Sequence, residues 1–229
     1  FVRGVVDCPD LQPTAARDNV LRDSAYHALR DALGKTIVAA LLNLAVHDQP
    51  RFLRLCDWHN DALKGMAAQH QEFGAAVLDF LPFATSQGQL TLPDYLARQS
   101  PGANGKRPLY FFTHEADASQ FYPLCQAHGV LGINAGGAFD ETLLRHYVSQ
   151  HPDQVELKPL DRLDDSALYP PLDVAAQLRY APLIRAMDRA LAEAEAPARA
   201  QIRQFQPAHL SAVVLSGQRL TAFDQMEQM

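Results

Sequence analysis

The sequence predicts an α/β protein in which a small sheet is covered by helices. Three observations lead to this class. Apolar residues recur every three or four positions between Ala25 and Val46, which is the period of a helix. A loop rich in proline and glycine lies at Ser100–Pro108. After that loop, short apolar runs alternate with segments of helical period, which favours strands crossed by helices.

The first half of the chain is expected to be helical. A helix over Ala25–Val46 is followed by a second one that opens at Pro50, because proline is favoured in the first turn of a helix. Gly74–Phe83 forms a further short apolar segment. Thr91–Asp94 has the pattern of a capping box, which predicts that a helix follows over Asp94–Arg98.

The segment after the loop is expected to supply the sheet and its covering helices. The expected strands are Leu109–Phe112, Gly129–Asn134 and Val155–Leu160. The expected helices between them are Glu115–His128, bent near Pro123, and Asp140–Gln150.

The last part of the chain is expected to begin a separate α+β unit. Residues 161–171 are acidic and contain proline, which predicts a linker. Pro182 fits the first turn of a helix that Pro197 ends. After it we expect two strands, Ala200–Phe205 and Leu210–Leu215, and the start of a helix over Leu220–Met229.

Composition narrows the possible functions. The formal net charge of −6 argues against a general nucleic-acid binder, which carries a basic excess. No apolar run approaches the ~20 residues needed to span a bilayer, so we expect no membrane partner. Cys8, Cys56 and Cys125 are few and far apart, which is typical of reduced thiols in a cytosolic protein. We therefore expect a cytoplasmic location.

The start of the chain carries the most specific pattern. An apolar run with strand character ends at Val6, a turn follows, and Arg17 stands ahead of a helical segment. The string FVRGVVDCPDLQPTAARD resembles F-V-R-G-V-V-D-S-x-D-L-P-L-N-x-S-R-E, a segment of the middle domain of the ninety-kilodalton heat-shock chaperones (heat shock protein 90, HtpG in bacteria). Because the chain opens on Phe1, without a methionine and inside an expected strand, we expect a piece of a longer protein.

The resemblance continues in order along nearly the whole chain. It includes Leu92–Arg98 ("S-L-x-D-Y-x-x-R"), Leu109–Glu115 ("I-Y-Y-I-T-x-E"), His128–Val130 with Phe139–Glu141 ("K-G-x-E-V…I-D-E"), and Ala181–Ile184. The family fold implies αβα sandwich subdomains of a chaperone middle domain, joined by a helical connector and followed by the start of an α+β C-terminal domain. The implied parts are a remnant of the large middle subdomain (1–24), the helical connector (25–100), the small αβα subdomain (101–160), the linker (161–171) and the first part of the C-terminal domain (172–229).

The resemblance implies an ATP-dependent chaperone of the stress response that assists protein folding. The family arginine that falls on Arg17 reaches the γ-phosphate of ATP held by a separate N-terminal domain, so Arg17 is the candidate catalytic residue. The full-length protein, a homodimer, would bind ATP and Mg, whereas this segment would bind no cofactor and would not hydrolyse ATP alone. Thr14, Ala16 and Leu21 stand where the family has asparagine, serine and glutamine. A non-catalytic α/β interaction module that has lost ATPase coupling is therefore the alternative.

Three residues are candidates for binding unfolded or partly folded client proteins. Glu141 falls on an acidic client contact of the bacterial family member, although Thr142 replaces the aromatic residue that follows it. Phe223 and Met226, with Met229, form a stripe at helical spacing, in a segment similar to a helix that the family exposes to clients. The alternative is that this stripe is buried against neighbouring helices.

Two other motifs have a simpler interpretation than a ligand site. Gly132–Gly137 could cradle a phosphate, but it matches neither the dinucleotide-binding nor the P-loop pattern. We expect a strand-to-helix turn that needs glycine at positive φ. Cys56 and His59 have the spacing of two metal ligands on a helix, but no second pair has matching spacing. A core cysteine beside a surface histidine is expected, and no metal site.

Overall fold

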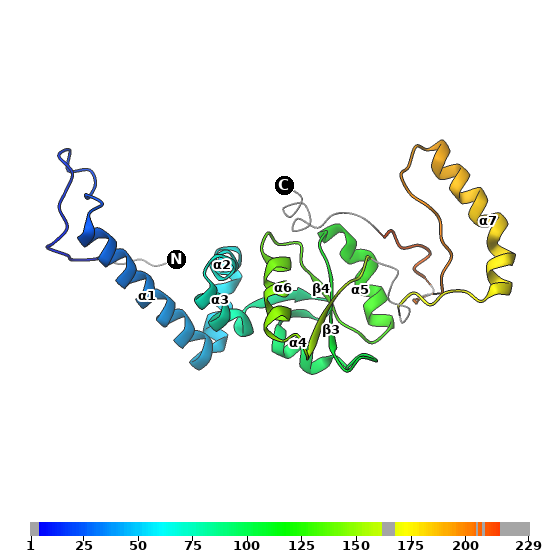
Figure 1. Cartoon of the computed structure of the whole chain (residues 1–229), viewed down its shortest axis with the longest axis horizontal. Coiled ribbons are helices and arrows are strands. Elements are labelled where there is room, and N and C mark those ends of the chain that lie inside the picture. The colour runs from blue at the N-terminus through cyan, green and yellow to red at the C-terminus, as the bar shows by residue number, and fades with distance from the viewer. Residues whose placement is uncertain (1–4, 162–167, 205, 208, 216–229) are drawn as a thin grey trace.

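The computed structural model describes residues 5–161, 168–204, 206–207 and 209–215. The molecule is elongated, with a helical arm at one end, a sheet layered with helices in the middle and a further helix at the other end (Figure 1). Among the described residues, no helix combines the length and the apolar character needed to cross a bilayer.

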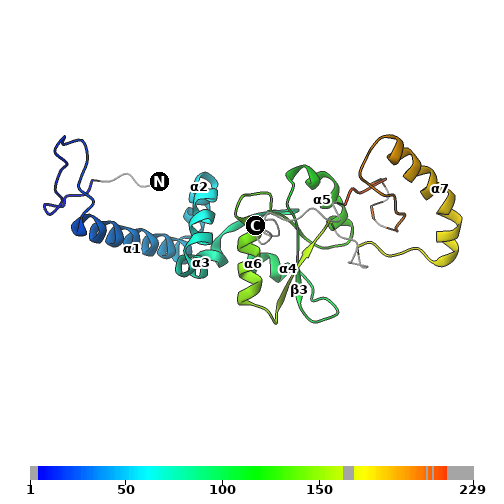
Figure 2. The same cartoon turned by 45° about the horizontal axis from the view of Figure 1, so that its top comes forward.

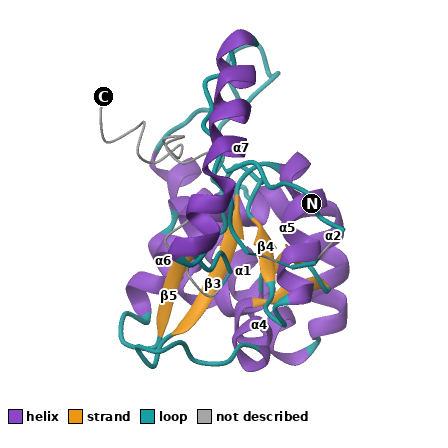
Figure 3. Ribbon diagram, turned by 90° about the vertical axis from the view of Figure 1, so that its right-hand side faces the viewer, coloured by secondary structure: helices purple, strands orange, loops and turns teal. Residues whose placement is uncertain are grey.

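Five strands form one mixed sheet in the order β2-β1-β4-β3-β5. They are β1 (Pro82–Thr85), β2 (Gly88–Thr91), β3 (Arg107–Phe112), β4 (Gly132–Asn134) and β5 (Val155–Pro159). β4 and β5 lie on either side of β3 and pair with it in parallel (Figure 3). β1 pairs antiparallel with β2 and β4. Because parallel strands need a crossover connection, a helix follows β3 and another follows β4. They are α5 (Ala118–Ala127), preceded by the 3-10 turn η2 (Glu115–Asp117), and α6 (Asp140–Gln150).

The central strand β3 divides the interior into two cores, because successive side chains of a strand point to opposite faces. Leu109 and Phe111 belong to a large core, and Tyr110 and Phe112 to a smaller one. The large core is covered by α2 (Gln49–Gln69), α3 (Gln71–Val77), the 3-10 turn η1 (Leu78–Phe80) and α6. The smaller core is covered by α5, on the other side of the sheet from α6 (Figure 1). The α/β class with its αβα layering is confirmed.

Two long helices leave this layered part and bury little of their surface. α1 (Ser24–His47) begins after Asp23, whose Oδ1 accepts a hydrogen bond from the backbone N–H of Tyr26 at 3.0 Å. Ala45 is the buried residue of α1, and α7 (Val174–Glu193) has none. Figures 1 and 2 show α1 and α7 reaching away from the sheet toward opposite ends of the molecule.

The structure corrects where the helical connector ends. Residues 82–98, expected within it, lie in the sheet layer as β1, β2 and α4 (Leu92–Arg98). Tyr95 is fully buried, and its Oη donates a hydrogen bond to the carbonyl oxygen of Leu131 at 2.6 Å. Thr91 is the N-cap of α4, because its Oγ1 accepts from the backbone N–H of Asp94. The two strands are only four residues long, so their side-chain alternation is too short to stand out in the sequence.

Expectations near the two ends of the chain also need correction. Val5 and Val6 lie outside any strand, and the described residues of Ala200–Phe205 and Leu210–Leu215 form none. The nearest ladder contact is an isolated bridge between Pro171 and Arg203. Short apolar runs need a neighbouring strand to pair with, and the described structure places none beside them. The helix expected over Leu220–Met229 lies outside the described residues.

The two prolines expected to start or bend helices lie inside regular helices. Pro182 is within α7, which begins earlier because Asp173 Oδ1 accepts from the backbone N–H of Ala176 at 2.7 Å. Pro123 is within α5, and the expected helix over Glu115–His128 is divided between η2 and α5. In the expected linker, Leu168 and Tyr169 are buried in the smaller core, so part of residues 161–171 is packed rather than free.

Candidate functional site

The arginine singled out by the sequence lies on a compact loop ahead of α1. The loop closes like a hairpin, since Leu21 N–H donates to the Gln12 carbonyl at 2.8 Å and Thr14 N–H donates to the Asn19 carbonyl at 2.9 Å. Arg17 N–H donates to the Thr14 carbonyl at 2.9 Å. Arg17 has a φ of 57°, a region that residues other than glycine rarely adopt. The tight turn therefore fixes the backbone of Arg17 at the tip of the loop.

The Arg17 side chain is available to an external anion. The residue is exposed, and its guanidinium has no hydrogen-bond or ion-pair partner within the described part of the chain. The nearby hydroxyl of Thr14 donates to Asp18 Oδ1 at 2.8 Å, so this polar pair braces the loop rather than the arginine. Leu21 is 44% exposed and offers no polar group through its side chain. The loop can present a cation, but its own polar neighbours do not orient that cation.

Glu141 lies far from Arg17, and its carboxylate is already engaged. It stands in the first turn of α6, where Oε1 accepts from Arg145 Nη2 at 2.8 Å and from Arg145 Nε at 3.1 Å. Its side chain is only 12% exposed. Phe223 and Met226, the other candidate client contacts, lie outside the described residues. The structure therefore does not gather the sequence-predicted residues into one site.

A buried ion pair ties α2 to the start of α6. Lys64 Nζ lies 2.6 Å from Asp140 Oδ1, and both side chains are at most 10% exposed. The same ammonium lies 4.1 Å from the centroid of the Phe83 ring. Asp140 Oδ2 accepts a hydrogen bond from Gly137 N–H at 3.1 Å. Every charge here has a partner inside the protein, so the pair holds the fold together rather than facing a ligand.

The Gly132–Gly137 segment runs from β4 into the turn before α6, and its glycines are needed for a reason other than the expected one. Its glycines do not have positive φ. A Cβ atom on Gly132 would lie 2.8 Å from Cys125 Sγ, and one on Gly137 would lie 2.6 Å from Asp140 Oδ2, so close approach requires glycine there. Asn134 Oδ1 accepts from Gly136 N–H at 3.0 Å. Because side chains of the loop occupy these amides, they do not form a phosphate cradle.

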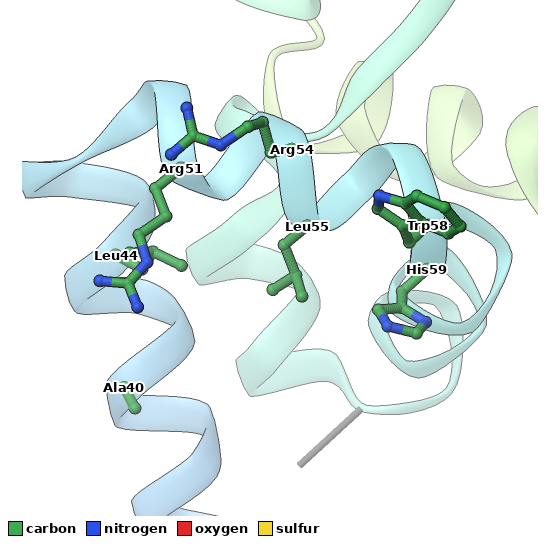
Figure 4. A pocket seen from close by; sticks show the side chains of 7 residues that line it. All are labelled: Ala40, Leu44, Arg51, Arg54, Leu55, Trp58 and His59. Atoms are coloured by element: carbon green, nitrogen blue, oxygen red, sulfur yellow. The ribbon is translucent and has the colours of Figure 1, made fainter. Parts of the chain in front are cut away.

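A groove between α1 and α2 is the site that the sequence did not predict. Its volume is about 530 Å³, and it is lined by two leucines, an alanine, two arginines, a tryptophan and a histidine: Ala40, Leu44, Arg51, Arg54, Leu55, Trp58 and His59. Figure 4 shows the two guanidinium groups on one side, the indole and imidazole on the other, and Leu55 between them. Trp58 is 85% exposed. We call this feature the α1–α2 groove.

Cys56 and His59 lie on α2, with Cys56 in the core and His59 at the groove. Cys56 is buried, and burial raises the pKa of its thiol to about 11. Among the described residues, no three His, Cys, Asp or Glu side chains gather as a metal site requires. His59 has non-helical backbone angles that kink α2, which places Trp58 and His59 at the end of the groove.

The chain was compared with protein-family profiles and with known proteins. No protein-family profile matches the chain. It is 24% identical over 154 residues to the chaperone protein HtpG of Idiomarina loihiensis, a match that covers 64% of this chain and 24% of that protein. With HtpG of Yersinia pestis it is 27% identical over 156 residues, with the same coverage. Over this part of its length the chain is similar to the HtpG chaperones.

The match to HtpG confirms the family resemblance inferred from the sequence. The matched part spans about a quarter of the length of these relatives, 24% in both cases. The fold can also be set beside the middle domain of a heat-shock protein from Plasmodium falciparum, with a TM-score of 0.46 and 9% identity over 62% of this chain and 61% of that one.

Sequence reasoning could have found part of the α1–α2 groove. Arg51, Arg54 and Trp58 are three or four residues apart, so they share one face of a helix. The sequence does not show that α1 forms the other side of the groove. Leu44 of α1 and Leu55 of α2 face the same hollow only because the chain turns at Asp48, which caps α2 by accepting from Arg51 N–H.

Proposed function

We propose that this chain is a segment of an ATP-dependent chaperone of the HtpG type and that Arg17 completes the ATP site of another domain. The single observation that carries this proposal is the similarity to chaperones named HtpG over 64% of the chain. The exposed, unpaired guanidinium of Arg17 at the tip of a closed loop supports the residue assignment.

The proposed role of Arg17 is electrostatic. A guanidinium stays charged and offers a planar fork of donors that matches phosphate oxygens. Placed beside the γ-phosphate, it stabilises negative charge that develops as the phosphoryl group is transferred. The arginine reaches this position only when two domains close on each other, so its contribution falls on the rate of hydrolysis rather than on nucleotide binding. Mg and ATP are held by the other domain.

Other features of the proposal concern the whole protein. It acts as a homodimer in the cytoplasm, binds unfolded or partly folded clients, and belongs to the stress response. Glu141, Phe223 and Met226 are the proposed client contacts in this chain. Since Arg145 holds the carboxylate of Glu141, client binding there uses the exposed edge of the ion pair rather than a free charge.

The test joins this chain to the ATP-binding domain of Yersinia pestis HtpG and compares steady-state ATP turnover with nucleotide affinity. Arg17→Ala is expected to lower turnover about tenfold, which is ~1.4 kcal/mol, with nucleotide affinity nearly unchanged. Arg17→Lys should not restore turnover, because an ammonium lacks the planar fork. Arg22→Ala is the matched control, since Arg22 is also exposed and lies in the same segment. Equal turnover of the Arg17→Ala and Arg22→Ala proteins would contradict the assignment.

A non-catalytic interaction module is the second candidate function. Ala16 and Leu21 replace polar family residues, and the structure leaves Arg17 without a polar side chain to orient it. Suppose that both Arg17 variants retain full ATP turnover and still keep a thermally denatured test protein from aggregating. This result would favour the interaction module and contradict a catalytic role of the loop.

A further inference from the structure

The α1–α2 groove combines three kinds of surface that rarely occur together by chance. Its floor is aliphatic, with Leu44 and Leu55 only partly covered. One side carries two cations, Arg51 and Arg54, and the far side carries Trp58. Tryptophan and arginine are the residue types most enriched among the residues that dominate binding energy at protein interfaces.

The charges of the groove are not neutralised from within. The guanidinium groups of Arg51 and Arg54 have no hydrogen-bond or ion-pair partner in the described part of the molecule. Asp48, at the N-cap of α2, accepts from Arg51 N–H, and Asp57 lines a separate hollow beside Pro82 and Leu90. Asp61 is exposed on the same helix, but among the described residues no carboxylate, Asp61 included, lines the groove itself. A chain with a net charge of −6 therefore keeps a local positive site on an otherwise acidic molecule.

Trp58 adds a second, independent observation. It is 85% exposed, although a tryptophan side chain has more apolar surface than almost any other. On this helix the neighbouring residues Phe52, Cys56 and Leu63 are buried in the large core, so the exposure of Trp58 follows from its place on the opposite face. Its removal from water is left to something outside the described chain.

We propose that the α1–α2 groove binds an acidic amphipathic segment of a partner protein. Carboxylates of the segment pair with Arg51 and Arg54, and an aromatic or aliphatic side chain packs between Leu55 and Trp58. Charge complementarity gives the contact its register, and burial of the indole gives it most of its affinity. This inference does not rest on the proposed ATP role of Arg17, which lies on a different loop.

A nucleic acid fits this groove less well than a peptide. Two arginines neutralise few phosphates, whereas nucleic-acid affinity grows with the number of phosphate contacts. The aliphatic floor favours leucine, isoleucine or phenylalanine over a sugar–phosphate backbone. The net charge of −6 also opposes the approach of a long polyanion more than that of a short segment with a few carboxylates.

The experiment measures fluorescence anisotropy of a labelled synthetic peptide in which glutamates alternate with leucine and phenylalanine at helical spacing. Saturable binding of this peptide to the whole chain is expected, with affinity that falls as salt rises because the ion pairs are solvent-exposed. The chain has one tryptophan, so the emission of Trp58 gives a second readout and should shift to the blue as the indole leaves water. No saturable binding below about 1 mM would overturn the proposal.

Variants locate the binding site. Arg51→Glu with Arg54→Glu is expected to weaken the peptide about tenfold or more, and Trp58→Ala by a similar factor. The matched control is Arg179→Glu with Arg185→Glu on α7, which changes the net charge equally at exposed arginines far from the groove and should alter affinity less than about twofold. Equal weakening by both double variants would mean that only overall charge matters, which overturns the assignment to the groove.

Two further probes test the chemistry of the occupant. A peptide with the same glutamates but serine in place of each apolar residue should bind much more weakly, and equal binding would overturn the role of Trp58 and Leu55. A single-stranded oligonucleotide of equal charge should bind more weakly than the amphipathic peptide. Tighter binding of the oligonucleotide would overturn the proposal and indicate that the groove binds nucleic acid. Arg17→Ala should leave peptide binding unchanged, so failure of this proposal and failure of the proposed ATP role are distinguishable.

Discussion

Helices α6 and α7 show how similar sequence patterns lead to opposite degrees of burial. Both carry apolar side chains at helical spacing, and both contain charged residues on the remaining faces. α6 buries Leu143, Leu144 and Tyr147 against the sheet. α7 buries none of its residues, and Leu178 is 72% exposed. An apolar stripe therefore predicts that a helix has a face to bury. It does not predict whether the described part of the chain covers that face.

The same contrast separates the layered middle of the molecule from the arm. Residues 49–160 form the sheet and the helices on both of its faces, and side chains such as Leu109, Phe121 and Ile133 are fully buried. The loop around Arg17 and most of α1 have solvent on nearly all sides. Stability resides in the first region, whereas the residues proposed to meet ATP lie in the second. Four measurements test this difference between the two regions.

The largest expected difference is in thiol reactivity. Cys8 lies in the N-terminal loop and is partly exposed, whereas Cys56 and Cys125 are buried in the two cores. Burial raises the pKa of Cys56 to about 11 and that of Cys125 to about 12, so neither forms the reactive thiolate at neutral pH. Under native conditions, labelling with a chromogenic disulfide should be at least about a thousandfold faster at Cys8, because the core thiols react only after unfolding. Labelling at equal rates would mean that the layered region opens as easily as the loop.

The next largest effect is expected at the buried ion pair. Asp140→Ala leaves the Lys64 ammonium buried without its carboxylate, and breaking such a pair from one side costs about 3–5 kcal/mol of unfolding free energy. Urea denaturation measures it. Glu141→Ala is the matched control one position along α6, because its ion pair with Arg145 is partly solvent-exposed and should contribute at most ~1 kcal/mol. Equal losses would mean that Lys64 finds water or another acceptor.

Leucine truncation compares α6 with α7 directly. Leu143→Ala removes a side chain that is 0% exposed and should cost about 2–5 kcal/mol, through lost burial and the cavity left behind. Leu178→Ala should change stability by no more than about 0.5 kcal/mol. Both values come from urea denaturation of the whole chain. A loss at Leu178 as large as that at Leu143 would show that α7 is covered in solution, for example by a second copy.

The sequence predicts the layered region better than the arm, for a physical reason. Strands and helices around β3 are specified by local patterns that tertiary packing reinforces, so α6 begins and ends at the expected residues. The short hairpin of β1 and β2 escaped prediction because eight paired residues carry too little alternation. The strands expected near Ala200 and Leu210 failed because an apolar run becomes a strand only where another strand receives it.

The candidate sites show the same limit. The position of Arg17 ahead of α1 could be predicted, since turn residues and a helix start flank it. The α1–α2 groove could not, because it exists only where Leu44 and Leu55 are brought together by the turn at Asp48. Its exposed Trp58 was visible in the sequence as a residue type, but its exposure is a property of the packed helix.

The smallest expected effects come from two helix caps, and they separate global from local stability. Thr91 caps α4 within the sheet layer, where its Oγ1 accepts from Asp94 N–H at 3.3 Å and donates to Asp94 Oδ2 at 2.9 Å. Asp23 caps α1 in the arm. Loss of either cap should cost about 1 kcal/mol where it acts. Thr91→Ala should therefore lower the urea midpoint of the whole molecule, because α4 unfolds together with the sheet.

Asp23→Ala should leave that midpoint unchanged and instead speed amide hydrogen exchange in the first turns of α1. The reason is that the start of α1 has few buried contacts, so it can open without disturbing the sheet. Hydrogen exchange followed by mass spectrometry, with peptides from α1 and from β3, distinguishes the two cases. If Asp23→Ala lowers the global midpoint as much as Thr91→Ala does, the arm and the sheet unfold as one unit. The arginine loop would then be held in place by the core rather than by its own turn.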